Sequence, residues 1–197
     1  MLSSALAGFA ASIVLIVAIG SQNAFVLRQG LRREHLLPVV LTCAISDLLL
    51  ITAGIAGLGA VVAAHPATVT VIRWAGAVFL LGYAVLAARR ALSRQALTTT
   101  GQGPRTLRAT VLTCLALTYL NPHVYLDTVL LLGSVAQQHT HRWLFAAGAA
   151  GASAVWFGVL GFGARHLAPV LEKPLAWRVL DGSIAAVMAV LAVGLVV

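Results

Sequence analysis

The sequence predicts an all-α membrane protein with six transmembrane helices, arranged as two inverted repeats of three helices each. Three observations lead to this fold class: an apolar composition, long stretches without charge, and a glycine spacing that occurs twice. Apolar residues make up 60% of the 197 residues and charged residues only 9%, whereas soluble domains carry about a quarter charged residues. The chain has too few charged side chains to cover a water-facing surface.

The net charge of +8 does not indicate a nucleic-acid partner. A nucleic-acid surface gathers its basic residues on one solvated face, but here they stand singly or in short groups between apolar runs. We therefore expect membrane lipid around the chain and no nucleic acid bound to it.

Each uncharged stretch is long enough for a transmembrane helix, which needs about 20 mostly apolar residues. The six predicted spans are 3–27, 36–63, 69–88, 109–136, 143–164 and 177–197. Arg73 lies inside the third span, near an end where a long cation can reach the interface. In the sixth span Asp181 follows Arg178 by three residues, so we expect a local ion pair. A five-span chain, with the sixth segment on the membrane surface, is the alternative.

The polar run 93–106 separates the spans into two sets of three. We therefore predict a first repeat at 1–91, a cytoplasmic linker at 92–107 and a second repeat at 108–197. The first, third and fifth connections hold eleven of the 13 basic residues, and the opposite side holds Arg73 and Arg142. Basic residues mark cytoplasmic loops, so both termini are predicted to lie outside. The first 27 residues lack a basic segment and are predicted to be a span, not a signal peptide.

The spacing GxxGxGA occurs at 54–60 in the second span and again at 158–164 in the fifth. Asn23 and Asn121 mark corresponding points of the first and fourth spans. Because each half has three spans, the second half must cross the membrane in the opposite sense. Inverted repeats are typical of alternating-access transporters, whose site lies between the halves. The glycines themselves are expected to let helices pack closely.

Two acidic residues are predicted to lie inside the membrane, where ionisable side chains usually have a function. Asp47 lies near the middle of the second span, with Ser46 and Thr42 as candidate hydrogen-bond partners and no basic residue within two turns. A carboxylate at that depth needs a proton or a cation, which a ligand or a distant arginine would supply. Asp127 is the second such residue, in the fourth span.

The fourth span contains a predicted helix break beside Asn121, because Pro122 removes a backbone donor. A break at this depth is tolerated only where protein or a water-lined cavity satisfies the freed groups. Tyr119, His123 and Tyr125 add polar groups to the same region.

The first span has a matching polar segment, in which Ser21, Gln22 and Asn23 follow Gly20. This pattern indicates local unwinding or an anchored ligand, the alternative being a hydrogen-bond cluster between helices.

Metal and thiol chemistry are not expected. His123 and Asp127 are one helical turn apart, but two ligands make an incomplete metal site. Cys43 and Cys114 lie in spans that are not equivalent in the two halves, so a thiol-disulfide carrier is disfavoured. Both cysteines are expected to be small packing residues.

Three segments, taken in order, resemble the lysine exporter (LysE) family, specifically its lysine/arginine exporter branch. They are Gly20-Ser21-Gln22-Asn23-Ala24-Phe25-Val26-Leu27-Arg28-Gln29-Gly30, Ile45-Ser46-Asp47 and Tyr119-Leu120-Asn121-Pro122-His123-Val124-Tyr125-Leu126-Asp127. The resemblance is strong over the first 130 residues. It implies a transporter, not an enzyme, in the bacterial inner membrane, which exports L-arginine, L-lysine or their toxic analogues without a cofactor.

A basic amino acid carries two cations and a carboxylate. Asp47 and Asp127 are suited to the cations, and amides freed beside Asn23 and Asn121 are suited to the carboxylate. The predicted substrate-binding residues are Ser21, Gln22, Asn23, Ser46, Asp47, Tyr119, Asn121, Pro122, Tyr125 and Asp127.

Proton antiport is the expected coupling. Moving a positive charge outward against the membrane potential costs about 2.3 kcal/mol per 100 mV, and exchange for an incoming proton removes that cost. Asp47 or Asp127 would bind either the substrate cation or the proton. Uniport is the alternative coupling. Neutral amino acids or homoserine-like compounds are the alternative substrates, followed by divalent metals, and a homodimer is left open.

Overall fold

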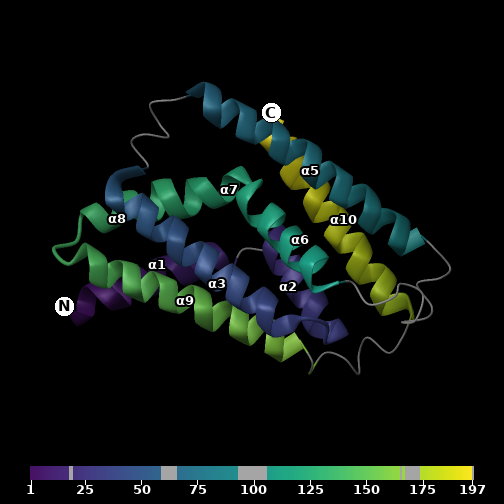
Figure 1. Ribbon diagram of the computed structural model, residues 1–197, viewed down its shortest axis with the longest axis horizontal. Coiled ribbons are helices and arrows are strands. Elements are labelled where there is room, and N and C mark those ends of the chain that lie inside the picture. Colours follow the sequence, from purple (N-terminus) through teal and green to yellow (C-terminus); the bar gives the residue numbers. More distant parts are fainter. Residues whose placement is uncertain (18–19, 59–65, 93–105, 165, 167–173, 197) are drawn as a thin grey trace.

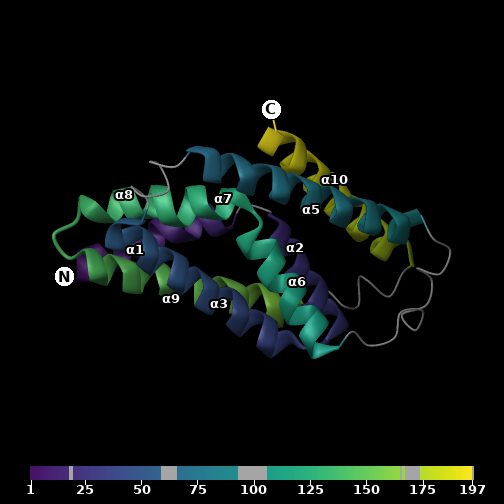
Figure 2. The same ribbon diagram turned by 45° about the horizontal axis from the view of Figure 1, so that its top comes forward.

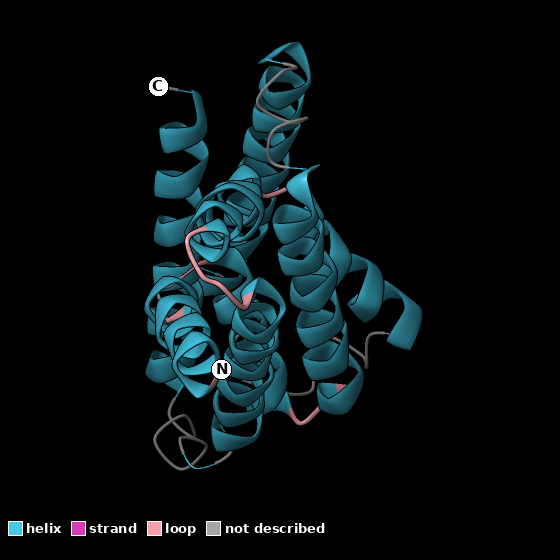
Figure 3. Ribbon diagram, turned by 90° about the vertical axis from the view of Figure 1, so that its left-hand side faces the viewer, coloured by secondary structure: helices cyan, strands magenta, loops and turns pink. Residues whose placement is uncertain are grey.

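Every regular element of the protein is a helix over the residues that the computed structural model describes, which are 1–17, 20–58, 66–92, 106–164, 166 and 174–196 (Figure 3). The all-α prediction is therefore confirmed. Most of the predicted linker 92–107 lies outside the described residues, so the division into two repeats stays a prediction.

Eleven helical segments follow one another along the described chain (Figure 1). They are α1 (Leu2–Ile16), α2 (Ser21–Arg32), α3 (Leu36–Ala53), η1 (Gly54–Leu58), α5 (Pro66–Leu92), α6 (Leu107–Tyr119), α7 (Pro122–Val124), η3 (Tyr125–Leu131), α8 (Leu132–Gln137), α9 (Arg142–Gly163) and α10 (Pro174–Val196). The segments η1 and η3 are π-helices.

Three described helices are long and apolar enough to cross a membrane: Leu36–Gly57, Arg142–Gly163 and Leu175–Val196. The pair α1 and α2 passes the same test when the two helices are counted together, as one broken span with a bend of 83°. The sixth predicted segment is thus long and apolar enough to span. The total of six spans is not confirmed and stays a prediction.

Two helices are broken where the sequence predicted it. Helix α1 ends at Ile16 and α2 begins at Ser21, and residues 18 and 19 lie outside the described residues. Helix α6 ends at Tyr119, and Pro122 opens the next helix, a position where its missing N–H costs nothing. Polar residues that follow each break are thereby brought to helix ends inside the protein.

The helices α3 and α9 pack against each other, with α1 along α9 and with α2 and α6 beside α3. Helices α5 and α10 form a separate long pair on one side of the molecule (Figures 1 and 2). Arg73 of α5 donates from Nε to the carbonyl of Leu195 at 2.7 Å. Arg178 of α10 donates from Nε to the carbonyl of Ala91 at 2.9 Å. The two helices therefore run antiparallel.

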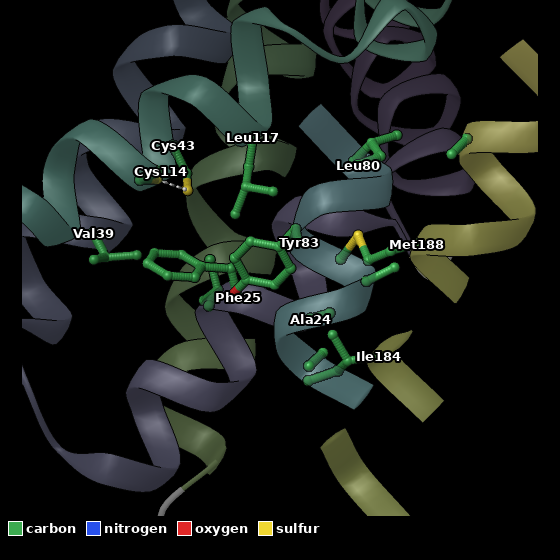
Figure 4. Packing of buried hydrophobic residues seen from close by; sticks show 14 of the residues in the cluster. Ala24, Phe25, Val39, Cys43, Leu80, Tyr83, Cys114, Leu117, Ile184 and Met188 are labelled. Carbon is green, nitrogen blue, oxygen red and sulfur yellow. Dashed lines mark hydrogen bonds between the residues drawn. The ribbon is translucent and has the colours of Figure 1, made fainter. Parts of the chain in front are cut away.

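A buried apolar cluster joins the α5–α10 pair to the rest of the protein. Phe25 of α2 and Leu117 of α6 meet Tyr83 of α5 and Met188 of α10 in this cluster (Figure 4). Cys43 and Cys114 belong to it as well, and their Sγ atoms lie 3.3 Å apart. The cysteines are packed inside the core, as expected, although the sequence did not predict that they touch.

Close backbone approach between α1 and α9 depends on two glycines. A Cβ atom at Gly8 would meet the carbonyl oxygen of Phe145, and one at Gly148 would meet the carbonyl oxygen of Ala5. A similar approach joins η1 to the segment after the second break, where a Cβ at Gly133 would lie 2.9 Å from the carbonyl carbon of Gly54. Small residues at these points let the helices touch along their backbones.

The glycine motif of the second span begins in the π-helix η1 (Gly54–Leu58). Gly57 has a φ of 103°, a conformation that favours glycine. Gln137 of α8 donates from Nε2 to the carbonyl of Ile55 at 2.9 Å and so satisfies a carbonyl in the irregular segment. Residues 59–65 lie outside the described residues.

The predicted local ion pair of Asp181 is wrong. Its carboxylate binds the guanidinium of Arg28 on α2, with Nη1 and Oδ1 3.0 Å apart. Both side chains are buried, so each needs a compensating charge at this place. Arg178 can instead reach a backbone carbonyl near the end of α5.

Gly148→Ala is expected to destabilise the protein by about 1–3 kcal/mol, because the added methyl group forces α1 and α9 apart. Gly151→Ala is the matched control on the same helix, since no atom lies within 4 Å of the Cβ it would add. Alanine is also favoured over glycine inside a helix. Thermal unfolding of the purified protein in detergent measures both. Equal unfolding temperatures for the two variants would contradict the packing described.

Candidate functional site

A cavity of about 210 Å³ lies where the two helix breaks meet. Its wall is formed by residues from both broken helices and from α3, together with one leucine of α10. They are Ser12, Leu15, Ile16, Gly20, Ser21, Gln22, Asn23, Asp47, Ile51, Asn121, His123, Val124, Asp127, Thr128, Leu132 and Leu191. The wall therefore combines an apolar side with polar groups that the breaks supply.

The structure brings six of the ten predicted site residues to this wall: Ser21, Gln22, Asn23, Asp47, Asn121 and Asp127. Three others do not line it: Ser46, Tyr119 and Tyr125. Tyr125 donates from its hydroxyl to the carbonyl of Tyr119 at 2.9 Å, so it satisfies the end of α6. The side chain of Pro122 lies outside the described residues.

Side chains close both breaks by binding the carbonyls at the ends of the preceding helices. Asn23 donates from Nδ2 to the carbonyl of Ile16 at 2.6 Å. Ser21 donates to the carbonyl of Leu117 at 3.4 Å and accepts from Nδ2 of Asn121 at 3.4 Å. The two breaks are thus joined to each other directly, through Ser21 and Asn121.

The two helices that start at these breaks differ in their capping. The Oδ1 atom of Asn121 accepts from the backbone N–H of His123 at 3.2 Å, so this helix has a side-chain cap. Helix α2 begins at Ser21, and its N-cap residue Gly20 provides no side-chain cap. Gly20, Ser21 and Gln22 all line the cavity. Free backbone N–H groups at a helix N-terminus favour an anion.

Gln22 adds a donor at the same place. The residue is buried, and its Nε2 atom has no hydrogen-bond partner among the described residues. A buried donor without a partner is costly. Gln22 is also one of the residues that line the cavity, and its side chain lies beside Cys43.

Asp47 is 3% exposed and reaches the cavity from α3. Its Oδ2 atom accepts a hydrogen bond from Ser153 of α9 at 2.6 Å. The expected partner Thr42 instead donates to the carbonyl of Pro38 at 2.7 Å. Within the described ranges, Asp47 forms no ion pair with a basic side chain.

Asp127 reaches the same cavity from the π-helix η3. Its side chain is half-buried, and it too forms no ion pair within the described part of the chain. His123 lines the wall one helical turn earlier. The described residues hold no group of three or more His, Cys, Asp or Glu that could bind a metal.

Two residues near the site were not predicted from the sequence: Ser153 and Trp156 of α9. Ser153 binds Asp47, and Trp156 donates from Nε1 to Oδ1 of Asn23 at 3.2 Å. The available signal was weak, because each stands in a helix that otherwise reads as apolar. Only the fold places them beside residues more than 100 positions earlier in the chain.

The chain matches the family model described as LysE type translocator over residues 13–197. A relative from Mycobacterium tuberculosis, provisionally named as an amino-acid transporter, is 53% identical over 88% of this chain and 87% of its own. The arginine exporter protein ArgO of Serratia proteamaculans is 44% identical over 95% and 93% of the two chains.

The lysine exporter LysE of Corynebacterium diphtheriae is 36% identical over 99% of each chain. No solved structure matches the chain. The family match covers nearly the whole sequence. The described helices of the chain are apolar and long enough to cross a membrane several times. The chain is thus a multi-pass membrane protein that belongs to the LysE type translocator family.

Proposed function

We propose that this protein exports basic amino acids, L-arginine or L-lysine, across the bacterial inner membrane. One observation carries the proposal: Asp47 and Asp127 line a single cavity between two broken helices, and within the described residues neither is neutralised by a basic side chain. A substrate with two cations supplies the missing charges. The names of the relatives, lysine exporter and arginine exporter, support the same substrate class.

The capping difference between the two breaks orients the substrate in the cavity. The uncapped N-terminus of α2 and the unpaired Nε2 atom of Gln22 provide donors for the α-carboxylate. Asp47 and Asp127 then take the α-ammonium and the side-chain cation. Asn23 and Asn121 hold the broken ends in place, and Ser21 links them.

The arrangement of helices supports an inverted repeat, in which α1–α2 corresponds to α6–α8, α3 to α9, and α5 to α10. The members α3 and α9 of one pair pack against each other, as do α5 and α10. Arg73 and Arg178 make the same kind of bond, each to a carbonyl near the far end of the other helix. Six spans, both termini outside and alternating access around the cavity complete the proposal.

We propose proton antiport as the coupling. A cation that leaves against an inside-negative potential costs about 2.3 kcal/mol per 100 mV, and a proton that enters in exchange cancels this cost. A carboxylate that holds either the substrate cation or a proton performs the exchange. Asp47 and Asp127 are the two candidates that face the cavity.

Asp47→Asn is expected to abolish arginine efflux from proteoliposomes, because the amide keeps the shape of the carboxylate but cannot neutralise a cation. Radiolabelled arginine and lysine measure the loss. Glu34→Gln is the matched control, since Glu34 does not line the cavity and binds the neighbouring Arg32. Efflux by Asp47→Asn at the rate of the unmodified protein would disprove the assignment of Asp47.

Gln22→Met is expected to weaken arginine binding by about tenfold, because a buried hydrogen bond to the carboxylate is lost. Agmatine, which is arginine without its carboxylate, should be transported equally by the variant and the unmodified protein. Half-saturating concentrations for the two compounds provide the comparison. If the binding of both compounds were weakened to the same degree, Gln22 would not face the carboxylate. Competition by neutral citrulline and homoserine tests the alternative substrate class in the same assay.

Downhill efflux from arginine-loaded proteoliposomes is expected to acidify the lumen, because each cation that leaves is replaced by a proton that enters. An acidic outside medium should accelerate efflux for the same reason. A pH-sensitive dye trapped in the lumen follows the first effect, and liposomes without protein are the control. A lumen of constant pH during efflux would rule out antiport in favour of uniport.

A further inference from the structure

Helix α9 presents two polar side chains that stand behind the cavity wall and that the transport mechanism leaves unused. Ser153 is fully buried and Trp156 is partly buried. Residues three positions apart lie on the same face of a helix. Neither residue lines the cavity, yet each donates a hydrogen bond to a residue that does.

The bond from Ser153 fixes one oxygen of Asp47. A serine inside an apolar helix commonly donates to a carbonyl of its own preceding turn, but the hydroxyl of Ser153 reaches across to α3 and donates to Oδ2 of Asp47 at 2.6 Å. Hydrogen bonds to an ionised carboxylate are short and strong. This bond holds the carboxylate in one orientation and leaves its Oδ1 atom as the oxygen for a ligand.

The bond from Trp156 fixes the amide of Asn23. The indole Nε1 donates to Oδ1 of Asn23 at 3.2 Å, while Nδ2 of Asn23 donates to the carbonyl of Ile16 at 2.6 Å. Both ends of the amide are therefore held. Because Asn23 lies in the first turn of α2, the indole also holds the uncapped helix end that faces the cavity.

We propose that Ser153 and Trp156 are positioning residues, which together set the spacing between the cation subsite at Asp47 and the carboxylate subsite at the start of α2. The proposal rests on the transport function and orientation given above. One rigid helix joins the two subsites, so two residues of α9 fix the distance between the substrate's carboxylate and the cation that Asp47 binds. The pair thereby selects an amino acid that spans this distance.

Ser153→Ala is expected to raise the half-saturating concentration by about tenfold for both arginine and agmatine, because Asp47 loses its orienting bond. The maximal rate should change by less than about threefold, because the substitution removes no group that touches the substrate. Ser153→Thr keeps the hydroxyl and should restore the affinity. Ser134→Ala is the matched control, because Ser134 is exposed and, among the described residues, its hydroxyl donates only to the carbonyl of Leu131, three positions earlier.

Trp156→Phe keeps an aromatic side chain but replaces the indole with a smaller phenyl ring and so removes the Nε1 donor. This variant is expected to weaken the binding of arginine about fivefold and to leave the binding of agmatine unchanged, because Asn23 lies at the carboxylate end of the site. Trp143→Phe, on the exposed start of α9, is the control. All variants are compared as purified, reconstituted protein with equal inserted amounts, and Ser153→Cys replaces Ser153→Ala if the latter does not fold.

The outcomes separate this proposal from the transport function. If the unmodified protein carries no arginine, or if Asp47→Asn transports normally, the proposed function is wrong. If the unmodified protein transports, Asp47→Asn does not, and Ser153→Ala has unaltered affinity, only the positioning role is overturned. The positioning role is also overturned if Ser153→Thr binds arginine as weakly as Ser153→Ala does. It is overturned as well if Trp156→Phe weakens the binding of agmatine as much as that of arginine.

Discussion

The structure depends on one constraint, that backbone groups inside a membrane must find hydrogen-bond partners within the protein. Two helices break where lipid offers no partner. Ser21 and Asn23 bind carbonyls at the ends of α6 and α1, and Tyr125 binds another at the end of α6. These side chains are therefore fixed by the breaks themselves. The cavity lies at this place because the residues that repair one break also meet the residues that repair the other.

The buried acidic residues are treated in two different ways. Asp181 is neutralised by Arg28, and this ion pair ties α2 to α10. Asp47 is equally buried, but among the described residues its carboxylate is bound by the hydroxyl of Ser153 and by no basic side chain. A buried carboxylate without a counter-charge is costly, so Asp47 needs a proton or a cation to be neutral. We propose that the difference between the two acids, one paired and one without a basic partner among the described residues, leaves Asp47 for a cation from outside the chain.

Much of the architecture could be predicted from local signals. Pro122 and Gly20 marked the two breaks because their effects on the backbone act within one turn. The sequence did not reveal that Ser153 meets Asp47, since the two are 106 positions apart and helical periodicity assigns a face without naming its partner. The expected pair of Asp181 failed for a related reason. Spacing along one helix made Arg178 a candidate, but only packing shows that Arg28 is buried beside Asp181 and needs a counter-charge.

The π-helix η3 makes the position of Asp127 in the cavity wall depend on the number of residues in one helical turn, as well as on their types. A π-turn holds one residue more than an α-turn, so the side of the helix that faces the cavity passes from Asp127 to Leu132. In an α-helix the corresponding residue would be Leu131, which is 47% exposed in the structure. Tightening of this π-turn into an α-turn without the loss of a residue would rotate one side of the cavity by roughly 100° relative to the other. The π-turn therefore keeps Asp127 and Leu132 on one side of the helix, and a one-residue deletion that lets the turn close as an α-turn is expected to leave them there.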